Sequence, residues 1–202
     1  MAKLPLEFYT QEEVCFVAKS MLGKTLVVEH EDCVLKAKIV ETEAYNGVVD
    51  KASHAFGDRF TSRTKTMYLA GGVSYVYLCY GIHHLFNVVT GIEGDPKAVL
   101  IRAVEPLEGT QKMLNNRRLT RFSVRVTSGP GALTQAMGIS TLDNGVSLLH
   151  NRIYLEEGED QIEPIVETTR IGVDYAKEDA LLPYRYYLSG NSFVSKPVKR
   201  LK

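Results

Sequence analysis

The segment IVETEAYNG, residues 39–47, contains the side chains with the most evident capacity for chemistry. In an extended strand successive side chains point to opposite faces, so Glu41, Glu43 and Tyr45 would share one face. Further along, Arg102 interrupts the apolar run AVLIRAVEP. An inward-facing arginine needs a carboxylate or water partner, and Glu43 is a candidate. The pattern favours a pocket where a carboxylate, an arginine and aromatic side chains converge.

Two other interpretations of these glutamates stay open at this point. The strand could lie at the edge of a sheet with both carboxylates in solvent, which is the common situation for such a triplet. The pair could instead belong to a glycoside hydrolase, whose two carboxylates flank a sugar. Residues i and i+2 of one strand lie about 6–7 Å apart at Cα, on the same side, so they cannot easily reach a sugar from both sides.

The segment GVSYVYLCYGIHHLFNVVT, residues 72–90, is typical of a β-hairpin that bends at Gly81. Alternation places Tyr75 and Tyr77 on one face and Tyr80 on the other, next to the bend. A buried phenol must find a hydrogen-bond partner, so a strand that only filled a core would use aliphatic residues or phenylalanine. We expect Tyr75, which lies furthest from the bend, to pack in the core. The other two tyrosines indicate a function.

Composition indicates one domain. The chain has 202 residues, is 45% hydrophobic and has a formal net charge of zero, which suits one sizeable core. Its three cysteines lack CxxC spacing, so neither a disulfide framework nor a zinc or iron–sulfur site is expected. The sequence shows no signal peptide and no stretch approaching the roughly 18 apolar residues of a membrane span. We expect a cytoplasmic protein without membrane contacts.

Charge is distributed unevenly along the chain. Residues 109–142, here called the basic segment, contain no aspartate or glutamate. A separated group of cations is what a polyanion-binding face requires, because each cation near a phosphate releases counterions. A solvated helix face would explain the same pattern. The cations of the basic segment are Lys112, Arg117, Arg118, Arg121 and Arg125.

The elements that must position these residues follow from hydrophobic patterning. Thr10 is a plausible N-cap, with Glu13 three residues later, for a helix that ends at Gly23. Two more helices are predicted at residues 110–118 and 131–139. Together with the strands this order predicts an α+β domain built on a mostly antiparallel sheet. Strands are predicted near residues 24–30, 34–45, 73–80, 85–90, 98–107, 146–157 and 184–190.

Several motifs, in this order, resemble the alkyladenine (3-methyladenine) DNA glycosylase family. They are ETEAY, ASHA, SYVYLCYG, AVLIRAVEPLEG, TSGPGALTQAMGI and RIGV. The resemblance extends from about Leu22 to Val194 and implies that residues 1–202 form a single such domain. It further implies a curved sheet with flanking helices and a hairpin that protrudes into the DNA minor groove. The implied activity is removal of alkylated or deaminated purines from duplex DNA, which leaves an abasic site.

The resemblance assigns roles to individual residues. Glu43 would be the general base for the water that captures C1′, and Arg102 would hold that water and that carboxylate. The extruded base would lie in a slot between Tyr45, Tyr77 and His54, held by stacking and cation–π attraction. A satisfied structural histidine is the alternative for His54. Tyr80 would wedge into the space that the flipped nucleotide leaves in the duplex.

The remaining assignments concern selectivity and the DNA backbone. Asn87 would line the pocket and exclude the amino group of guanine, although a structural hydrogen bond to a neighbouring loop is an alternative. Ile171 and Gly172 would lie opposite, near the water. Gly131, before a helix, could place backbone N–H groups toward a phosphate, or simply form a turn. Arg117, Arg118 and Arg121 of the basic segment are the candidates for backbone phosphate contacts.

The resemblance also sets the expected partners. The substrate would be double-stranded DNA containing damaged purines, bound by a monomer in the bacterial nucleoid without metal or cofactor. Nothing resembles a lysine nucleophile, so we expect a monofunctional enzyme without lyase activity. Two departures from the family pattern, FTSR at residues 60–63 and LAGG at residues 69–72, are expected to lie outside the base slot and to alter DNA contacts.

One alternative function remains, a non-catalytic module that binds RNA or single-stranded DNA through the cations and the tyrosine hairpin. Glu43 argues against it, because a carboxylate in an anion-binding groove repels phosphate.

Overall fold

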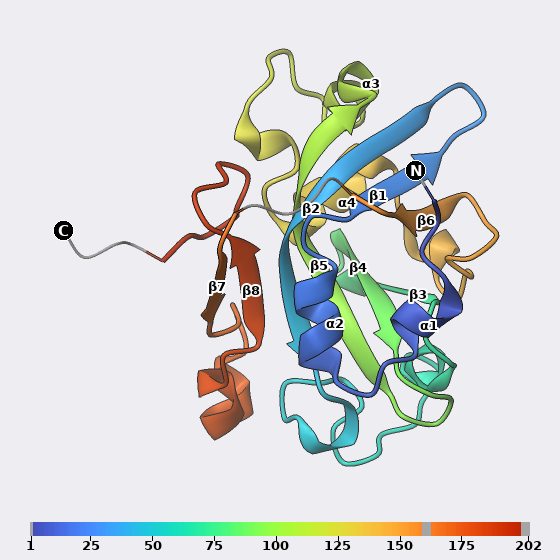
Figure 1. Cartoon of the computed structure of the whole chain (residues 1–202), viewed down its shortest axis with the longest axis vertical. Helices are drawn as coiled ribbons and strands as arrows, with labels where there is room; N and C mark the ends of the chain where they lie inside the picture. Colours follow the sequence, from blue (N-terminus) through green and yellow to red (C-terminus); the bar gives the residue numbers. More distant parts are fainter. Residues whose placement is uncertain (1, 159–162, 199–202) are drawn as a thin grey trace.

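The two longest strands, β2 (Val34–Tyr45) and β5 (Lys97–Glu108), lie side by side in the middle of an antiparallel sheet (Figure 1). The sheet has the order β3-β4-β5-β2-β1-β6, while β8 pairs with β2 and β7 pairs with β8. With the helices, this gives the predicted α+β domain. The other strands are β1 (Thr25–Glu29), β3 (Ser74–Cys79), β4 (His83–Thr90), β6 (Ile153–Glu156), β7 (Ile165–Thr168) and β8 (Arg185–Leu188). The computed structural model describes residues 2–158 and 163–198.

The α-helices are short and surround this sheet. They are α1 (Leu6–Tyr9), α2 (Val14–Ser20), α3 (Thr110–Asn116) and α4 (Pro130–Met137). Single 3-10 turns join them to the strands: η1 (Gly47–Val49), η2 (Lys65–Tyr68), η3 (Val124–Val126), η4 (Thr141–Asp143) and the longer η5 (Asp174–Leu181). Within the described ranges, none of the helices could span a bilayer, being too short and insufficiently apolar.

Helix α2 covers one face of the central strands. Val17 and Ala18 are buried there, and the hydroxyl of Thr42 on β2 donates a hydrogen bond of 2.8 Å to the carbonyl of Ala18. Because side chains alternate along a strand, Glu41 and Glu43 point to the opposite face. The packing of α2 thus fixes which face of β2 remains for chemistry.

Two predictions about elements were wrong, and one strand was missed. Thr10 does not cap α2: it follows α1, and its hydroxyl bonds back to the carbonyl of Leu6. The N-cap position of α2 belongs to Glu13, without a side-chain capping bond. Only Ile153–Glu156 of the predicted strand at residues 146–157 is extended, and strand β7 was not predicted. Each error concerns a segment of a few residues, where tertiary contacts outweigh local propensity.

A double irregularity in the pairing of β2 with β5 lies at the centre of the sheet. Ile39 pairs with Val104 and Glu41 with Ala103, so β2 advances by two residues while β5 advances by one. The next pair is Thr42 with Ile101, so Arg102 is left without a cross-strand partner. Such bulges redirect side chains. Here the unpaired residue is the arginine whose side chain meets both glutamates.

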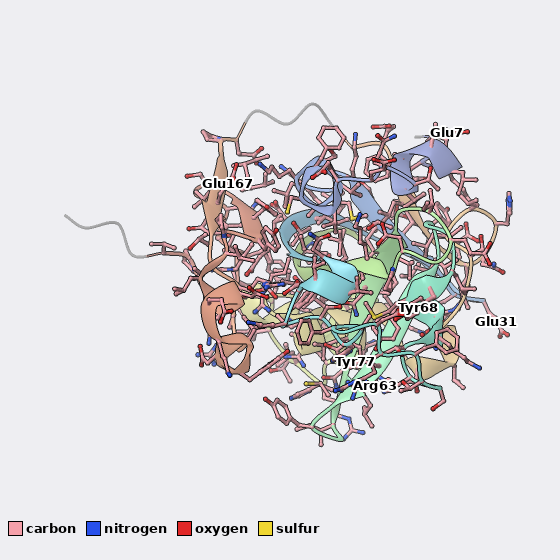
Figure 2. The ribbon with its side chains drawn as sticks, turned by 90° about the horizontal axis from the view of Figure 1, so that it is seen from below. Glu7, Glu31, Arg63, Tyr68, Tyr77 and Glu167 are labelled. Atoms are coloured by element: carbon pink, nitrogen blue, oxygen red, sulfur yellow. The ribbon has the colours of Figure 1, made fainter. Side chains whose placement is uncertain are left out.

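Strands β3 and β4 form the predicted hairpin, which projects from the body of the molecule at the bottom of Figure 2. The backbone N–H of Ile82 donates to the carbonyl of Cys79 at 3.1 Å, closing a β-turn with Tyr80 and Gly81 as its central residues. Both central residues have positive φ, 51° for Tyr80 and 73° for Gly81, as a type I′ turn requires. A tyrosine in this region is uncommon and strained, and its side chain is 91% exposed.

Candidate active site

Glu43 is held at both carboxylate oxygens. Its Oε1 accepts a hydrogen bond of 2.8 Å from the backbone N–H of Ile171. Its Oε2 accepts from the hydroxyl of Tyr45 at 2.9 Å and from Nη1 of Arg102 at 3.2 Å. The side chain is fully buried in the protein without DNA. Donors on both oxygens fix the orientation of the carboxylate before any substrate arrives.

Glu41 is also fully buried, which contradicts the interpretation of two solvated glutamates on an edge strand. Strand β2 is central, with β5 on one side and β1 and β8 on the other. Nε of Arg102 and Nε of Arg185 donate to Glu41 Oε1 at 3.0 and 2.7 Å. Burial raises the pKa of Glu41, but the two guanidinium groups more than offset this and the pKa lies below its ordinary value. Glu41 is therefore an ion-paired structural carboxylate.

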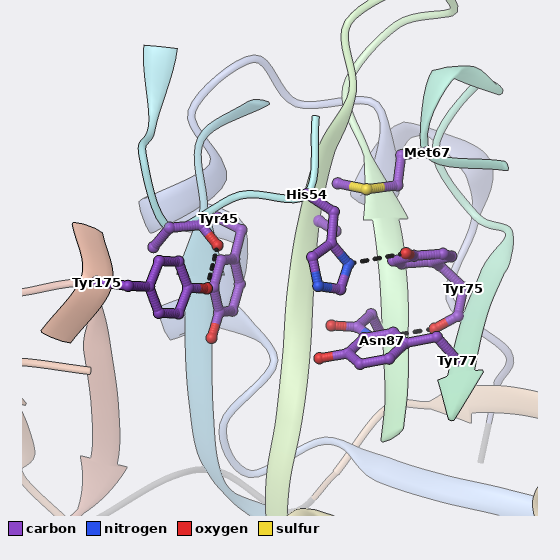
Figure 3. A pocket seen from close by; sticks show the side chains of 9 residues that line it. Tyr45, His54, Met67, Tyr75, Tyr77, Asn87 and Tyr175 are labelled. Carbon is purple, nitrogen blue, oxygen red and sulfur yellow. Dashed lines mark hydrogen bonds between the residues drawn. The ribbon is translucent and has the colours of Figure 1, made fainter. Parts of the chain in front are cut away.

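A slot lined by aromatic rings opens next to Tyr45, the tyrosine whose hydroxyl bonds to Glu43 (Figure 3). Its inner cavity of about 40 Å³ has room for a few water molecules. A wider mouth of about 430 Å³ shares the walls Tyr45, His54, Tyr77 and Tyr175 and is bordered by Arg102, Ile171 and Gly172. Glu43 lines neither part, but its three hydrogen-bond donors, Tyr45, Arg102 and Ile171, all border the mouth, so a ligand there would lie next to the groups that hold Glu43. The inner cavity is lined by Tyr45, His54, Tyr75, Tyr77, Asn87 and Tyr175, among others.

His54 is held as a neutral imidazole with a defined tautomer. Arg63 Nη2 lies 3.3 Å from its Nε2, and the hydroxyl of Tyr75 lies 2.9 Å from its Nδ1. Arginine can only donate, so Nε2 accepts and Nδ1 carries the proton toward the Tyr75 oxygen. Burial, together with the charges of Arg63 and Arg59, lowers the pKa of His54 to about 4.

Tyr75 packs in the core as expected, at 2% exposure, but it also belongs to the site. Its hydroxyl holds His54 and its ring lines the slot. Arg63, the last residue of FTSR, corrects another expectation. Its guanidinium lies 4.9 Å from the ring centroid of Tyr77, as the neighbouring labels in Figure 2 indicate. FTSR therefore reaches the aromatic slot, which the sequence had placed it outside.

We expect Arg63→Ala to raise the pKa of His54 from about 4 toward its ordinary value of 6.5. The reason is that removing a nearby positive charge favours the imidazolium, while burial continues to oppose it. Titration of the imidazole proton resonances by NMR measures the change. Arg118→Ala serves as the control, because Arg118 is not among the charges that act on His54. An unchanged pKa in Arg63→Ala would show that burial and Arg59 set it without Arg63.

Comparisons with known proteins show the family of the chain. A family model described as Methylpurine-DNA glycosylase matches residues 7–192. The chain belongs to this family.

Bacterial relatives resemble the chain over nearly its whole length. A protein of Desulfitobacterium hafniense (strain Y51), named "Putative 3-methyladenine DNA glycosylase", is 43% identical over 96% of this chain and 99% of its own. Proteins with the same name from Clostridium novyi (strain NT) and Chlamydia pneumoniae are 43% and 44% identical. They cover 97% and 90% of this chain, and 100% and 93% of their own lengths.

In this methylpurine-DNA glycosylase family member, Ile171 and Gly172 border the mouth; their predicted place near the water stays a prediction. Gly172 has φ of 74°, a value that favours glycine. The preceding Arg170 forms a buried bidentate ion pair with Asp50, and its guanidinium lies 5.0 Å from the ring centroid of Tyr45. Arg170 thus supports both the N–H and the phenol that hold Glu43.

Asn87 both lines the inner cavity and makes a structural hydrogen bond, which goes to the neighbouring strand β3 and not to a loop. Its Nδ2 donates to the carbonyl of Tyr75 at 3.0 Å, which is a structural hydrogen bond within the hairpin, and its side chain also lines the inner cavity. Because the amide nitrogen is engaged by the backbone, Oδ1 is the group left to face a ligand (Figure 3). The side chain is 3% exposed, so its position is fixed.

Sequence reasoning missed Tyr175 of η5. Its ring lines both the cavity and the mouth, and its hydroxyl donates to the carbonyl of Ala52 at 3.0 Å. Figure 3 shows it beside Tyr45. The only local signal is an aromatic residue shortly after the RIGV motif, and such a residue would ordinarily be read as part of the core.

The outer candidates lie apart from the slot. Pro130 borders the mouth at the start of α4, and a Cβ on Gly131 would lie 3.0 Å from the ring of His83, so Gly131 permits close packing on the hairpin. Arg117 bonds to Gln135 and to the carbonyl of Arg125. Within residues 2–158 and 163–198, no ion pair involves Arg117, Arg118 or Arg121.

Proposed function

We propose that this protein is a monofunctional DNA glycosylase. It extrudes alkylated or deaminated purines from duplex DNA, hydrolyses the N-glycosidic bond and leaves an abasic site for base excision repair. The observation that carries the proposal is Glu43, a buried carboxylate fixed beside an aromatic slot. A protein that only bound nucleic acid would gain nothing from an anion at that place.

The chemical step requires a base and stabilisation of positive charge. The N-glycosidic electron pair leaves with the purine, and C1′ acquires oxocarbenium character. A water oxygen bonds to C1′ while its proton passes to Glu43. The Glu43 carboxylate also stabilises the developing positive charge on the sugar, and Arg102 holds the carboxylate in place. A cationic alkylated purine leaves as a neutral molecule, so this step needs no protein acid for that class of substrate.

Selectivity comes from the slot. Tyr45 and Tyr77 offer π-faces that attract a cationic or electron-poor ring, and neutral His54 adds an edge contact without a competing charge. Asn87 lies at the inner wall, and its exclusion of the guanine amino group would be steric, because Oδ1, the free group of the fixed amide, accepts hydrogen bonds. Of the described residues, no lysine lines the cavity or its mouth, which favours hydrolysis over lyase chemistry.

The alternatives fit the geometry less well. A glycoside hydrolase needs a second carboxylate facing the substrate, but Glu41 is buried and bonded to two arginines and Ser195. The decisive experiment is incubation of the protein with methylated duplex DNA and chromatography of the released bases. Free 3-methyladenine with intact strands supports the proposal. Binding without release would favour the non-catalytic module, and cleaved strands would contradict monofunctional action.

Tyr80 is proposed to enter the minor groove and replace the flipped nucleotide in the stack. Tyr80→Ser should weaken binding to a lesion duplex much more than binding to an abasic single strand, because only the duplex has a stack to fill. Fluorescence anisotropy with both DNAs measures the difference. Equal losses would reject the wedge, and Phe16→Ser, an exposed aromatic change on α2, serves as the control.

The basic segment is proposed to contact phosphates on either side of the lesion, with one protein molecule bound to the DNA of the nucleoid. If Arg117, Arg118 or Arg121 makes such a contact, its replacement by alanine should reduce the slope of log affinity against log salt by roughly one. Titrations at several salt concentrations give the slope. A slope equal to that of the unmodified protein would mean that this arginine contacts no phosphate and lies on a solvated helix face.

A further inference from the structure

Four buried charges alternate in sign across the sheet beneath the site. Glu43 meets Arg102 at 3.2 Å, Arg102 meets Glu41 at 3.0 Å, and Glu41 meets Arg185 at 2.7 Å. All four side chains are at most 8% exposed. Charges removed from water must be compensated nearby. The net charge of the two carboxylates and two guanidinium groups is zero. Arg102 is therefore ion-paired with both Glu41 and Glu43, and not with Glu43 alone.

The C-terminal segment completes the surroundings of Glu41. The backbone N–H of Ser195 donates to Oε2 at 2.6 Å and its hydroxyl donates to Oε1 at 3.0 Å. Arg185 bonds in turn to the carbonyl of Lys196. Buried Phe193 and Val194 anchor this segment. Ser195 lies beyond residue 192, where the match to the family ends.

Other groups face Glu43 but do not compensate for Arg102. Tyr45 and the N–H of Ile171 are neutral donors. Arg170 and the phenol of Tyr175 also act on Glu43 electrostatically, but the charge of Arg170 is paired with Asp50. Within the described residues, Glu41 is thus the one carboxylate besides Glu43 that is ion-paired to Arg102.

We infer that Glu41 is a positioning residue that sets the basicity of Glu43 by sharing Arg102, and that Ser195 holds Glu41 in that role. The inference rests on the proposed function, in which Glu43 takes a proton from water. Without the charge of Glu41, Arg102 would be ion-paired with Glu43 only. The Glu43 carboxylate would then bind a proton less readily. Without the Ser195 hydroxyl, the ion pair between Glu41 and Arg102 would strengthen. The ion pair between Arg102 and Glu43 would weaken, and Glu43 would bind a proton more readily.

The test is the pH dependence of single-turnover base release from a duplex with one 3-methyladenine analogue or hypoxanthine, from about pH 4 to pH 8. In Glu41→Gln the midpoint of the acid limb should fall by about one pH unit and the plateau rate by about tenfold. In Ser195→Ala the midpoint should rise by about half a unit. Affinity for lesion DNA should change in neither variant, since neither side chain lines the cavity or its mouth.

Ser192→Ala is the matched control, an exposed serine three residues earlier in the same segment, and its profile should superimpose on that of the unmodified protein. Opposite displacements in Glu41→Gln and Ser195→Ala support the inference, because mere loss of folding lowers the amplitude without moving the midpoint. If Glu41→Gln does not fold, the pH profile of Ser195→Ala, a change at a half-buried position, is sufficient to test the inference. Superimposed profiles with active wild-type protein overturn only this inference, whereas no release by wild-type protein overturns the proposed function with it.

Discussion

Glu43→Gln is expected to slow base release by at least about 100-fold, equivalent to roughly 3 kcal/mol of transition-state stabilisation. Glutamine keeps the size and one acceptor oxygen but can neither take the proton of the water nor oppose positive charge on the sugar. Binding to lesion DNA should persist or tighten, since a negative charge near the phosphates is removed. Single-turnover release and equilibrium binding, measured on the same duplex, separate the two effects.

Glu41 is not a neutral control for this substitution, because it is buried and bonded to two arginines. Glu108→Gln is a better control: it makes the same chemical change on β5, at an exposed position outside the slot. It should release bases at the wild-type rate. Wild-type rates in Glu43→Gln would remove the catalytic assignment, and a large loss in Glu108→Gln would point to a general effect of charge.

Arg170→Met is expected to lower the free energy of unfolding by about 3–5 kcal/mol, because it leaves Asp50 buried without its ion pair. The two side chains are 0% and 1% exposed. The same change should slow base release, since Arg170 supports the ring of Tyr45 and precedes the N–H that holds Glu43. Urea unfolding followed by circular dichroism measures the stability.

Lys51→Met provides the comparison, since it breaks the exposed ion pair with Glu178 in the same region. Exposed pairs contribute little, so its unfolding curve should nearly coincide with that of the wild-type protein. Similar losses of unfolding free energy in the two variants would mean that the buried Arg170–Asp50 pair contributes no more to stability than an exposed pair. A double variant, Arg170→Met with Asp50→Asn, should lose less stability than Arg170→Met if the unpaired charge is the cause.

The extent to which sequence predicted this site depended on the range of the interactions. Alternation along residues 39–45 placed Glu41 and Glu43 on one face, because that periodicity is local. It could not show that both are buried, since burial depends on β8 and on Ser195, more than 140 positions away. No sequence pattern predicted the bulge at Arg102, although the arginine within an apolar run indicated a buried partner.

The hairpin shows the same distinction. The sequence predicted the bend at Gly81. It did not predict the positive φ of Tyr80, because a tyrosine does not ordinarily adopt a left-handed backbone conformation. Arg63 was expected away from the slot because its loop has no regular pattern that would fix its direction. Tyr175 was missed for a related reason, since the path of η5 after Gly172 is set by contacts with Ala52.

The partners of Glu41 also determine when this site can form during translation. Arg102 follows Glu41 by 61 positions, Arg185 by 144 and Ser195 by 154. A nascent chain that has emerged only as far as β5 has two carboxylates and one guanidinium at the centre of its sheet, and such an imbalance resists removal from water. The β2–β5 pair should therefore stay hydrated on the ribosome until β8 and the following segment emerge. Nascent chains that have not yet exposed Arg185 and Ser195 would then be unable to excise bases.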